Sequence, residues 1–473
     1  MEKVLQSLEK NLEFELGEEQ RTVLLSVFNF FENKDLTEAA LIGAAGTGKT
    51  TVTKLIIQYL EQITRSYTIA APTHKARKVI SETTERNVVT IHQLLKLKPS
   101  IDILELDFRD LRFNSNQEYE HIPHNGVLLV DESSMINEIL FDHIVNACKE
   151  YKCQVLFIGD AAQLQPVKDH KLSKFTRVEN KFTLNKIYRQ AEENPILVTL
   201  TELRTKHKRF FPELNSENGS LILYESWQEL LKNNIFAFQD MVETENPNRV
   251  KLLAYTNKRV TAFNQVIRKM LFNNTAEYNI GDILMAYDSC EIDARDPSDF
   301  RTNKSFKHKL YNSNDYIVRS ISEEAKFIHG VLVKGFELEL YDVYEYMSVS
   351  VFVLSKDNDP KVFEHLAASL EELRINAIQT TNKSQKNKYW VDYFKLNATF
   401  LTPIDLIYDN RIVKSRSIGY GYCLTTHKSQ GSSFDTVLVD MGNILRCTDA
   451  AELRQLQYVA LSRTRKDVHM LTK

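Results

Sequence analysis

Residues Gly43 to Thr50 read GAAGTGKT, and this stretch decides the fold. The apolar run Ala39 to Ile42 comes before it. The residues after it are apolar at helical spacing: Val52, Leu55, Ile56, Tyr59 and Leu60. In a strand, glycine loop and helix of this kind, backbone N–H groups and the positive end of the helix dipole converge on one spot. The stretch therefore predicts a loop that binds the phosphates of a nucleotide. The competing interpretation is a glycine turn between ordinary elements.

The loop residues have distinct expected roles. Gly43 and Gly48 let the backbone curl, Lys49 can reach the β- and γ-phosphates, and the Thr50 hydroxyl can ligate Mg²⁺. The predicted ATP-binding residues of this stretch are Gly43, Ala45, Gly46, Thr47, Gly48, Lys49, Thr50 and Thr51. ATP and Mg²⁺ are therefore the expected cofactors.

Two acidic residues follow a second apolar strand. Gly126 to Val130 form an unbroken apolar run, as expected of a parallel strand that is buried on both faces, and Asp131 and Glu132 come next. A carboxylate at the carboxyl end of such a strand lies beside the glycine loop. We expect Asp131 to hold Mg²⁺ through water, and Glu132 to act as the catalytic base that orients and deprotonates the attacking water.

A glutamine is expected at the same edge of the sheet. The next apolar strand, Gln154 to Ile158, leads through Gly159 to Gln163. The Gln163 amide is placed to sense the γ-phosphate. Its competing interpretation is a polar loop residue.

Composition excludes several classes of protein. The 473 residues are enough for two or more domains, and 43% hydrophobic with 26% charged residues is typical of a globular protein. The five cysteines have neither metal-site nor disulfide spacing, which favours reduced thiols in a cytoplasmic protein. No apolar run is as long as a membrane span, and the charged, amphipathic N-terminus differs from a signal peptide. A net charge of −3 means that any nucleic-acid site needs a local positive field.

The chain divides into alternating and strand-rich regions. From Gly17 to Leu184, apolar strands alternate with helical patterns, which is typical of a doubly wound α/β sheet. Lys98 to His121 interrupt this pattern with an alternation and a turn that predict a projecting β-hairpin. A second α/β region begins near Pro195 and returns from Gly419. Between its two parts lies a tyrosine-rich, strand-dominated insertion with one predicted helix, Lys361 to Thr380.

Taken in order, the motifs resemble superfamily-one helicases of the five-prime-to-three-prime class, the RecD and Dda-like enzymes. After the glycine loop they are APTHKA (71–76), TIHQLL (90–95), DESSM (131–135), GDAAQLQPV (159–167), IYRQ (187–190), TTHKSQGSSFD (425–435) and YVALSRTR (458–465). The resemblance covers nearly the whole chain. It implies an ATP-dependent DNA helicase that moves five-prime to three-prime on single-stranded DNA and unwinds duplex DNA.

The resemblance also implies an α/β fold with two RecA-like P-loop sheet domains in one chain. The expected parts are a first RecA-like domain (1–96 and 123–190), an inserted β-hairpin or pin (97–122), a second RecA-like domain (191–280 and 419–473) and a β-rich insertion (281–418). In Dda-like proteins this insertion has an SH3-like fold with a protruding tower. Here the sequence itself predicts strands, one helix and aromatic residues.

Further nucleotide-site residues follow from the resemblance. Arg189 and Arg463 would neutralise charge at the γ-phosphate, an effect worth ~10³ or more in rate. The competing interpretation for each is a surface arginine in an ion pair. Gln20 resembles the family's adenine-contacting glutamine, or is a solvated first-turn residue of the helix Glu19 to Phe31. Gly431 would complete the ATP site.

The resemblance places DNA contacts in both sheet domains. The expected residues are Pro72, Thr73, His74, Thr90, His92, Asn257, Thr426, His427 and Lys428. Hydroxyls and backbone N–H groups bind phosphates without reading sequence, as a translocating enzyme requires. Without its motif, His92 would be interpreted as a satisfied core histidine. Near the end of the insertion, lysines interleaved with aromatics favour strand binding by Trp390 and Phe394. A helix that packs its aromatic stripe into the insertion's own core is the alternative.

An aromatic side chain of the pin is the expected wedge that separates the strands. Phe113 fits this role, and Phe108 is its competitor.

The expected partners are single-stranded DNA and tailed or forked duplex DNA, with replication or recombination proteins, and no membrane. The expected pathways are DNA replication, recombination and repair. The protein is expected to be a monomer. Competing functions are a RecD-like motor subunit of a nuclease complex, a ring-forming AAA-type protein remodeller, and a DNA-binding protein with a structural nucleotide. Lys49, Glu132 and the two arginines argue against a structural nucleotide. A YVALSR motif within the same chain argues against a ring.

Overall fold

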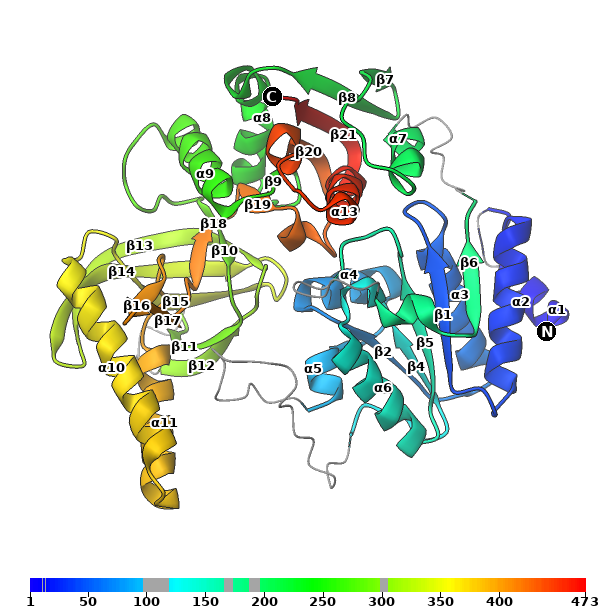
Figure 1. Cartoon of the computed structure of the whole chain (residues 1–473), viewed down its shortest axis with the longest axis horizontal. Coiled ribbons are helices and arrows are strands. Elements are labelled where there is room, and N and C mark those ends of the chain that lie inside the picture. The colour runs from blue at the N-terminus through cyan, green and yellow to red at the C-terminus, as the bar shows by residue number, and fades with distance from the viewer. Residues whose placement is uncertain (11, 13, 97–118, 166–172, 187–195, 298–304) are drawn as a thin grey trace. The chain divides into compact units, whose positions relative to one another are not determined.

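The computed structural model describes residues 1–10, 12, 14–96, 119–165, 173–186, 196–297 and 305–473 (Figure 1). They form two compact units. The first unit comprises Met1–Ser226, Leu253–Tyr255 and Ser429–Lys473, and the second comprises Trp227–Leu252 and Thr256–Lys428. Arg189, and Phe108 and Phe113 of the predicted pin, lie outside the described residues. Within the described ranges, no helix combines the length and the apolarity needed to span a membrane.

The N-terminal part of the first unit is a parallel sheet with helices on both faces. Its six strands follow the order β3-β2-β4-β5-β1-β6, and all of its pairs are parallel. The strands are β1 (Glu38–Gly43), β2 (Tyr67–Ala71), β3 (Val88–Thr90), β4 (Val127–Val130), β5 (Gln154–Gly159) and β6 (Lys181–Leu184). The helices are α1 (Glu2–Glu9), α2 (Glu18–Glu32), α3 (Lys49–Gln62), α4 (His74–Thr84), α5 (Ile91–Leu94) and α6 (Glu138–Glu150), with 3-10 turns at Ser133–Met135 and Lys174–Arg177.

Successive residues of each strand face opposite layers of this sheet. In β1, Ala39 and Leu41 join a core cluster with residues of α2 and α3, whereas Ala40 joins a cluster with residues of α6. Burial on both faces explains the unbroken apolar runs in the sequence. Because β5 pairs with both β1 and β4 in parallel, the carboxyl ends of these three strands lie at one edge of the sheet.

The C-terminal part of the first unit has a second group of mostly parallel strands. In it, β20 (Phe434–Asp440), β21 (Thr464–Leu471) and β8 (Gly219–Tyr224) are parallel, and β7 (Leu214–Ser216) is antiparallel to β8. The helices here are α7 (Ile196–Leu203), α12 (Met441–Ile444) and α13 (Ala450–Ser462). The Asp449 carboxylate caps α13 by accepting a hydrogen bond from the backbone N–H of Glu452.

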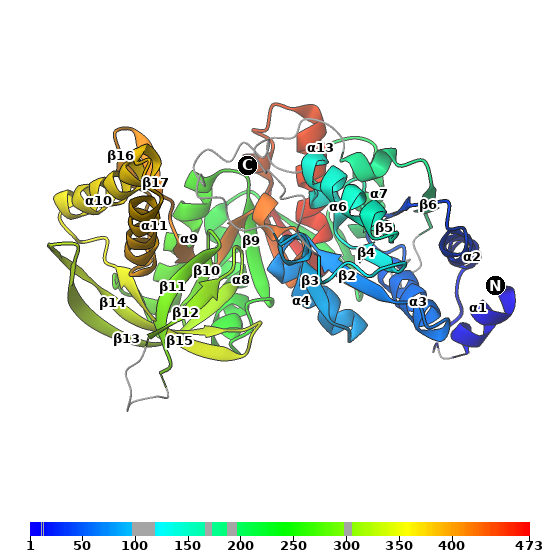
Figure 2. The ribbon, with the colours of Figure 1, turned by 90° about the horizontal axis from the view of Figure 1, so that it is seen from below.

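The second unit is built on an antiparallel sheet of seven strands in the order β12-β11-β15-β14-β13-β10-β18. The strands are β10 (Ile283–Ala286), β11 (Cys290–Arg295), β12 (Ser305–Leu310), β13 (Asp315–Ile328), β14 (Val331–Asp342), β15 (Met347–Leu354) and β18 (Ile418–Tyr420). The other elements are α8 (Trp227–Glu243), β9 (Val250–Ala254), α9 (Asn257–Phe272), α10 (Pro360–Gln379), α11 (Lys383–Ala398), the hairpin β16 (Leu406–Tyr408) and β17 (Arg411–Lys414), β19 (Cys423–Thr425) and a 3-10 turn at His427–Ser429. Helices α10 and α11 lie on one face of the sheet (Figure 2).

The two faces of the antiparallel sheet have separate cores. Val351 and Val353 of β15 belong to one cluster, whereas Phe352 and Leu354 pack with α10 residues in another. The long β13–β14 hairpin turns at His329 and Gly330, both with positive φ, as a two-residue hairpin loop requires.

The predicted α/β class with a β-rich insertion is confirmed, and two details are corrected. The described residues of the insertion form two helices rather than one, because the mixed lysines and aromatics of α11 obscure its apolar period. The predicted strand Tyr420 to Leu424 is two strands. Tyr420 pairs with β10, while the Tyr422 carbonyl accepts a hydrogen bond from Leu252 of β9, so the chain changes sheets between them. The predicted domain boundaries stay a prediction.

Candidate functional site

The glycine loop joins β1 to α3 at the carboxyl edge of the parallel sheet. Gly46 and Gly48 adopt φ of 84° and 82°, the left-handed region that favours glycine. A Cβ atom on Gly48 would lie 2.2 Å from Nε2 of Gln20, so a larger residue would both strain the backbone and displace the Gln20 amide. The Lys49 ammonium donates to the carbonyls of Gly43 at 2.6 Å and Ala44 at 3.0 Å. The lysine therefore lies over the loop, where it can reach a bound phosphate.

Gln20 is fixed against this loop. Its side chain is buried, its amide donates to the Thr47 carbonyl at 3.2 Å, and its Oε1 accepts from the backbone N–H of Gly17 at 3.1 Å. The interpretation as a solvated first-turn residue is therefore wrong. Contact with adenine stays a prediction.

The acidic pair follows β4 in a strained turn. Glu132 has φ of 51°, uncommon for a residue with a side chain, and its N–H donates to Oδ1 of Asp131 at 2.7 Å. Burial, together with the neighbouring charge of Glu132, raises the pKa of Asp131 to about 7. A cation beside Asp131 would favour its charged form.

The residues present fit a magnesium ion held mainly by phosphates and water. The Thr50 hydroxyl at the start of α3 and the Asp131 carboxylate are hard oxygen donors of the kind that Mg²⁺ prefers. In the described ranges, no three His, Cys, Asp or Glu side chains gather to hold a metal. Such a cluster is not expected, because Mg²⁺ at nucleotide sites uses one or two protein ligands.

A tyrosine of α13 contacts the glycine loop. The Tyr458 hydroxyl donates to Oδ2 of Asp160 at 2.7 Å and accepts from the backbone N–H of Ala45 at 3.1 Å. Both Tyr458 and Asp160 are buried. We assigned neither a role from the sequence, although both stand in motifs. The sequence signal that could have identified them is their position, since Tyr458 begins the YVALSR motif and Asp160 stands in the GDAAQ motif.

Gln163 follows β5 at the same edge. It is 5% exposed, and its Oε1 atom has no hydrogen-bond partner among the described residues. An orphaned buried acceptor is costly, so it marks a place where a ligand or water is expected to donate. An attacking water is such a donor.

Arg463 caps the carboxyl end of α13, and its side chain is only 6% exposed. The interpretation as a surface arginine is therefore wrong. Arg463 donates through Nη1 to the Ser432 carbonyl at 3.2 Å and through Nη2 to Oγ of Ser462 at 3.1 Å, while its Nε has no partner within the described chain. Gly431, which precedes Ser432 in the chain, has φ of 70°, and a Cβ there would lie 3.4 Å from that of Ala76. The first unit thus brings the predicted arginine's helix, Gly431 and the glycine loop into one compact body.

Two of the predicted DNA contacts in the first unit are helix caps. The Thr73 and Thr90 hydroxyls accept hydrogen bonds from the backbone N–H groups of Ala76 and Gln93. His92 is exposed, so the interpretation as a core histidine is wrong. Pro72 and His74 are half-buried at the start of α4.

The predicted DNA contacts of the second unit differ in exposure. Asn257 is exposed at the start of α9, Thr426 is buried and His427 is half-buried. The Lys428 ammonium donates to the Tyr287 carbonyl and to Oδ1 of Asn312, both at 3.0 Å. These bonds attach the motif to the β-rich insertion.

The aromatic residues of α11 divide between core and surface. Trp390 is 9% exposed and lies 6.1 Å from the Phe394 ring, which is 40% exposed. Trp390 thus matches the packing alternative, and a bound strand would reach Phe394 more readily.

Comparison with known proteins identifies relatives over nearly the whole chain. The model of an AAA domain matches residues 33–169, and that of a UvrD-like helicase C-terminal domain matches residues 420–471. The ATP-dependent DNA helicase dda of Enterobacteria phage T4 is 26% identical over 90% of this chain and 92% of that protein. The RecBCD enzyme subunit RecD of Buchnera aphidicola is 23% identical over 99% of this chain and 78% of that protein.

Among solved structures, Pif1 helicase from Bacteroides in complex with ADP-AlF3 and ssDNA matches 97% of this chain and 92% of that chain, at 16% sequence identity and a TM-score of 0.47. The curated relatives and the helicase family model confirm the prediction from the ordered motifs: the chain is a homologue of the RecD and Dda-like helicases of superfamily one.

Proposed function

We propose that this chain is an ATP-dependent DNA helicase that moves five-prime to three-prime on single-stranded DNA. The observation that carries the ATPase part is the common edge of the parallel sheet, where the glycine loop, Asp131, Glu132 and Gln163 follow β1, β4 and β5. Homology to DNA helicases over most of the chain supports the coupling of this site to DNA. The direction of movement rests on the family resemblance alone.

The site residues divide the work of ATP hydrolysis. Lys49 would exchange its bonds to the loop carbonyls for bonds to phosphate oxygens. Glu132 would accept a proton from the attacking water, which the orphaned Oε1 of Gln163 would help to position. Arg463, with Arg189, would neutralise the charge that develops on the γ-phosphate. Mg²⁺, held by Thr50 and Asp131, would supply further charge stabilisation.

The DNA contacts extend this proposal to both sheet domains. His92, Asn257 and Phe394 are exposed and suit contacts to a passing strand, and Phe113 of the pin would split the duplex. The protein would act as a monomer on tailed or forked duplexes, beside replication or recombination proteins. A RecD-like subunit of a nuclease complex would use the same residues.

An ATPase and unwinding assay tests the function. We expect single-stranded DNA to stimulate ATP hydrolysis strongly, and a duplex with a five-prime single-stranded tail to be unwound while one with only a three-prime tail is not. Unwinding from the three-prime tail alone would reverse the direction and leave the ATPase assignment intact. Stimulation by unfolded protein instead of DNA would favour an AAA-type remodeller.

A pin variant separates a wedge from a core residue. Phe113→Ala should slow unwinding strongly and leave DNA-stimulated ATPase intact, because base–aromatic stacking is worth ~1–3 kcal/mol. Collapse of both ATPase and melting temperature would instead identify a core residue, and unchanged unwinding would shift the assignment to Phe108.

A further inference from the structure

The second unit contains a pocket between helix α9 and strand β18 that none of the predicted sites uses. Its volume is about 40 Å³. Its walls combine hydrogen-bond donors, cations and aromatic rings from distant parts of the sequence, among them Thr261, Gln265, Tyr287, Lys356, Arg416 and Tyr420.

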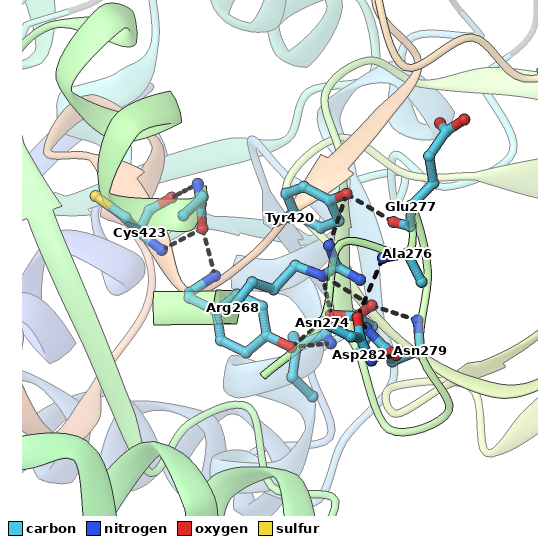
Figure 3. Close-up of polar contacts among 11 residues, drawn as sticks. Arg268, Asn274, Ala276, Glu277, Asn279, Asp282, Tyr420 and Cys423 are labelled. Carbon is cyan, nitrogen blue, oxygen red and sulfur yellow. Dashed lines mark hydrogen bonds and ion pairs between the residues drawn. The ribbon is translucent and has the colours of Figure 1, made fainter. Parts of the chain in front are cut away.

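One wall of the pocket is held by a polar network (Figure 3). The Arg268 guanidinium lies 4.5 Å from the Tyr420 ring centroid and donates through Nη1 to the Tyr420 hydroxyl at 3.2 Å. Its Nε donates to both carboxylate oxygens of Asp282, at 2.8 and 3.0 Å. The Tyr420 hydroxyl donates in turn to the Glu277 carbonyl at 2.6 Å. Because its ring and hydroxyl are both fixed, the Tyr420 wall is formed in advance of any ligand.

Positive charge is in excess around this wall. Lys356 lies 5.1 Å from the centroid of the Tyr420 ring, and Arg416 lies 3.5 Å from that of Tyr287. Within the part of the chain that the structure describes, no carboxylate forms an ion pair with either side chain. The neighbouring Glu277 carboxylate accepts from the Lys356 backbone N–H at 3.0 Å and from the Ser355 hydroxyl.

The positive charges in and beside the pocket repel one another. Burial lowers the pKa of Lys356, and the charges of Arg268 and Arg416 lower it further, while Glu277 opposes them. The pKa of Lys428, which lies 4.6 Å from the Tyr287 ring, is lowered to about 8 by burial and by Arg416, with Asp288 opposing. A bound anion would relieve this repulsion. Arg268 does not line the pocket, but its guanidinium lies 4.5 Å from the centroid of the Tyr420 ring and adds to the positive charge beside that wall.

The size of the pocket limits what can enter. One water molecule needs about 10–15 Å³ by this measure, so the pocket has room for a few waters. A phosphate group suits that space, whereas a nucleobase is too large. Hydroxyl, amide, ammonium and guanidinium groups are the usual donors to nucleic-acid phosphates.

We propose that this pocket binds a backbone phosphate of single-stranded DNA, with Lys356 and Arg416 as its two charged contacts. The inference rests on the proposed function, because a translocating enzyme presents such a strand to its surface. It places a phosphate contact in the β-rich part of the chain, beyond the residues predicted from the motifs.

Charge-neutral variants of the two cations test the proposal. For Lys356→Gln and Arg416→Gln, affinity for an oligothymidylate should fall by up to about fivefold at low salt, as for a partly exposed ion contact. The slope of log affinity against log salt should become shallower by about 0.7 in each variant, because single-stranded DNA releases about that many counterions per phosphate contact. Melting temperature and DNA-independent ATPase should not change.

Two further variants serve as controls. Lys361→Gln removes the same charge from an exposed position of α10 and should leave the salt slope unchanged. Arg416→Lys keeps the charge and should restore most of the slope. Equal loss in Arg416→Lys and Arg416→Gln with a lower melting temperature would show that Arg416 supports the fold, and it would overturn the proposal unless Lys356→Gln changes the slope.

Inorganic phosphate distinguishes DNA from a free anion. If phosphate raised the melting temperature of the native protein but not of Arg416→Gln, while the salt slope for oligothymidylate stayed equal in all variants, the pocket would bind a free anion and the proposal would be wrong. If the native protein neither bound single-stranded DNA nor responded to it in ATPase rate, the proposed function itself would fail. Normal DNA-stimulated ATPase with unchanged slopes would overturn the pocket alone.

Discussion

Two buried polar clusters, one in each unit, are completed in different ways. In the second unit, Lys251 and Asp315 are both fully buried, 2.8 Å apart, and each has a further partner, the Gly421 carbonyl and the Tyr344 hydroxyl. In the first unit, by contrast, the residues of the candidate nucleotide site, among them Lys49 and Glu132, form an incomplete set, because Oε1 of Gln163 and Nε of Arg463 are buried with no partner in the described chain. Buried polar groups are normally paired, so the complete cluster belongs to the fold and the incomplete one indicates a place for a ligand.

The largest expected effect comes from removing the chemistry of the incomplete cluster. Lys49→Ala and Glu132→Gln should each abolish ATP turnover, by about 10³-fold or more. Lys49→Ala should also weaken nucleotide binding, whereas Glu132→Gln should retain nucleotide and DNA binding. Steady-state ATPase and nucleotide titration measure both. Lys54→Ala, an exposed lysine of the same helix, is the matched control and should be fully active. Near-normal hydrolysis by Glu132→Gln would make the base assignment wrong.

Arg463→Ala should have the next largest effect, a loss of about 10³-fold in ATPase, or about 4 kcal/mol, with single-strand affinity retained. The physical reason is that its buried guanidinium has donors to spare for the γ-phosphate. Arg465→Ala, two residues away and 58% exposed, should keep its activity. Preserved DNA-stimulated turnover in Arg463→Ala would contradict the assignment of Arg463 to the γ-phosphate.

The complete cluster should fail in stability rather than in chemistry. Lys251→Met leaves the Asp315 carboxylate buried without its cation, and breaking a buried pair in this way costs about 3 kcal/mol or more. Calorimetry should show a large drop in melting temperature. Lys307→Met removes a partly exposed ion pair from the same unit and should change stability by less than about 1 kcal/mol. If the two substitutions lowered the melting temperature equally, the buried pair would contribute no more to stability than an exposed one, and the Lys251 cluster could not be called structural.

The sequence predicted those parts of the site whose residues are adjacent in the chain or follow parallel strands. The glycine loop, Asp131 and Glu132 come directly after an apolar run, and Gln163 follows four residues after β5. The carboxyl ends of parallel strands meet at one edge. The burial of Gln20 against Thr47 could not be predicted, because it depends on the path of α2 across the sheet.

Contacts between residues far apart in the sequence were missed for the same reason. A hydrogen bond joins Ala45 to Tyr458, although the two residues are 413 positions apart in the sequence. The pocket with Lys356 and Arg416 joins α9 to segments of the β-rich insertion, where no local pattern relates them. The motifs thus predicted the placement of residues in the first unit better than the surface of the second.

Tyr458→Phe should have the smallest effect and should sharpen the comparison between the clusters. The substitution removes one hydroxyl and keeps the ring in its buried place. Asp160 then loses the donor to its Oδ2, while its Oδ1 still accepts from Ala162 at 2.9 Å. The Ala45 N–H, in the loop that holds the phosphates, loses its acceptor. A hydrogen bond of this kind is worth about 1 kcal/mol, so we expect about a fivefold lower kcat/KM for ATP.

Tyr59→Phe provides the matched control for this change. Tyr59 is also 1% exposed, and its hydroxyl donates to Glu32 at 2.8 Å, near the far end of the helix that starts at Lys49. Both variants should lower the melting temperature by a similar, small amount, because each removes one buried hydrogen bond. Only Tyr458→Phe should change the kinetics of ATP hydrolysis, since only its hydroxyl contacts the phosphate loop. If both variants changed melting temperature alone, the bond from α13 to the loop would belong with the complete, structural cluster, and the coupling of that helix to the nucleotide would have to run through Arg463.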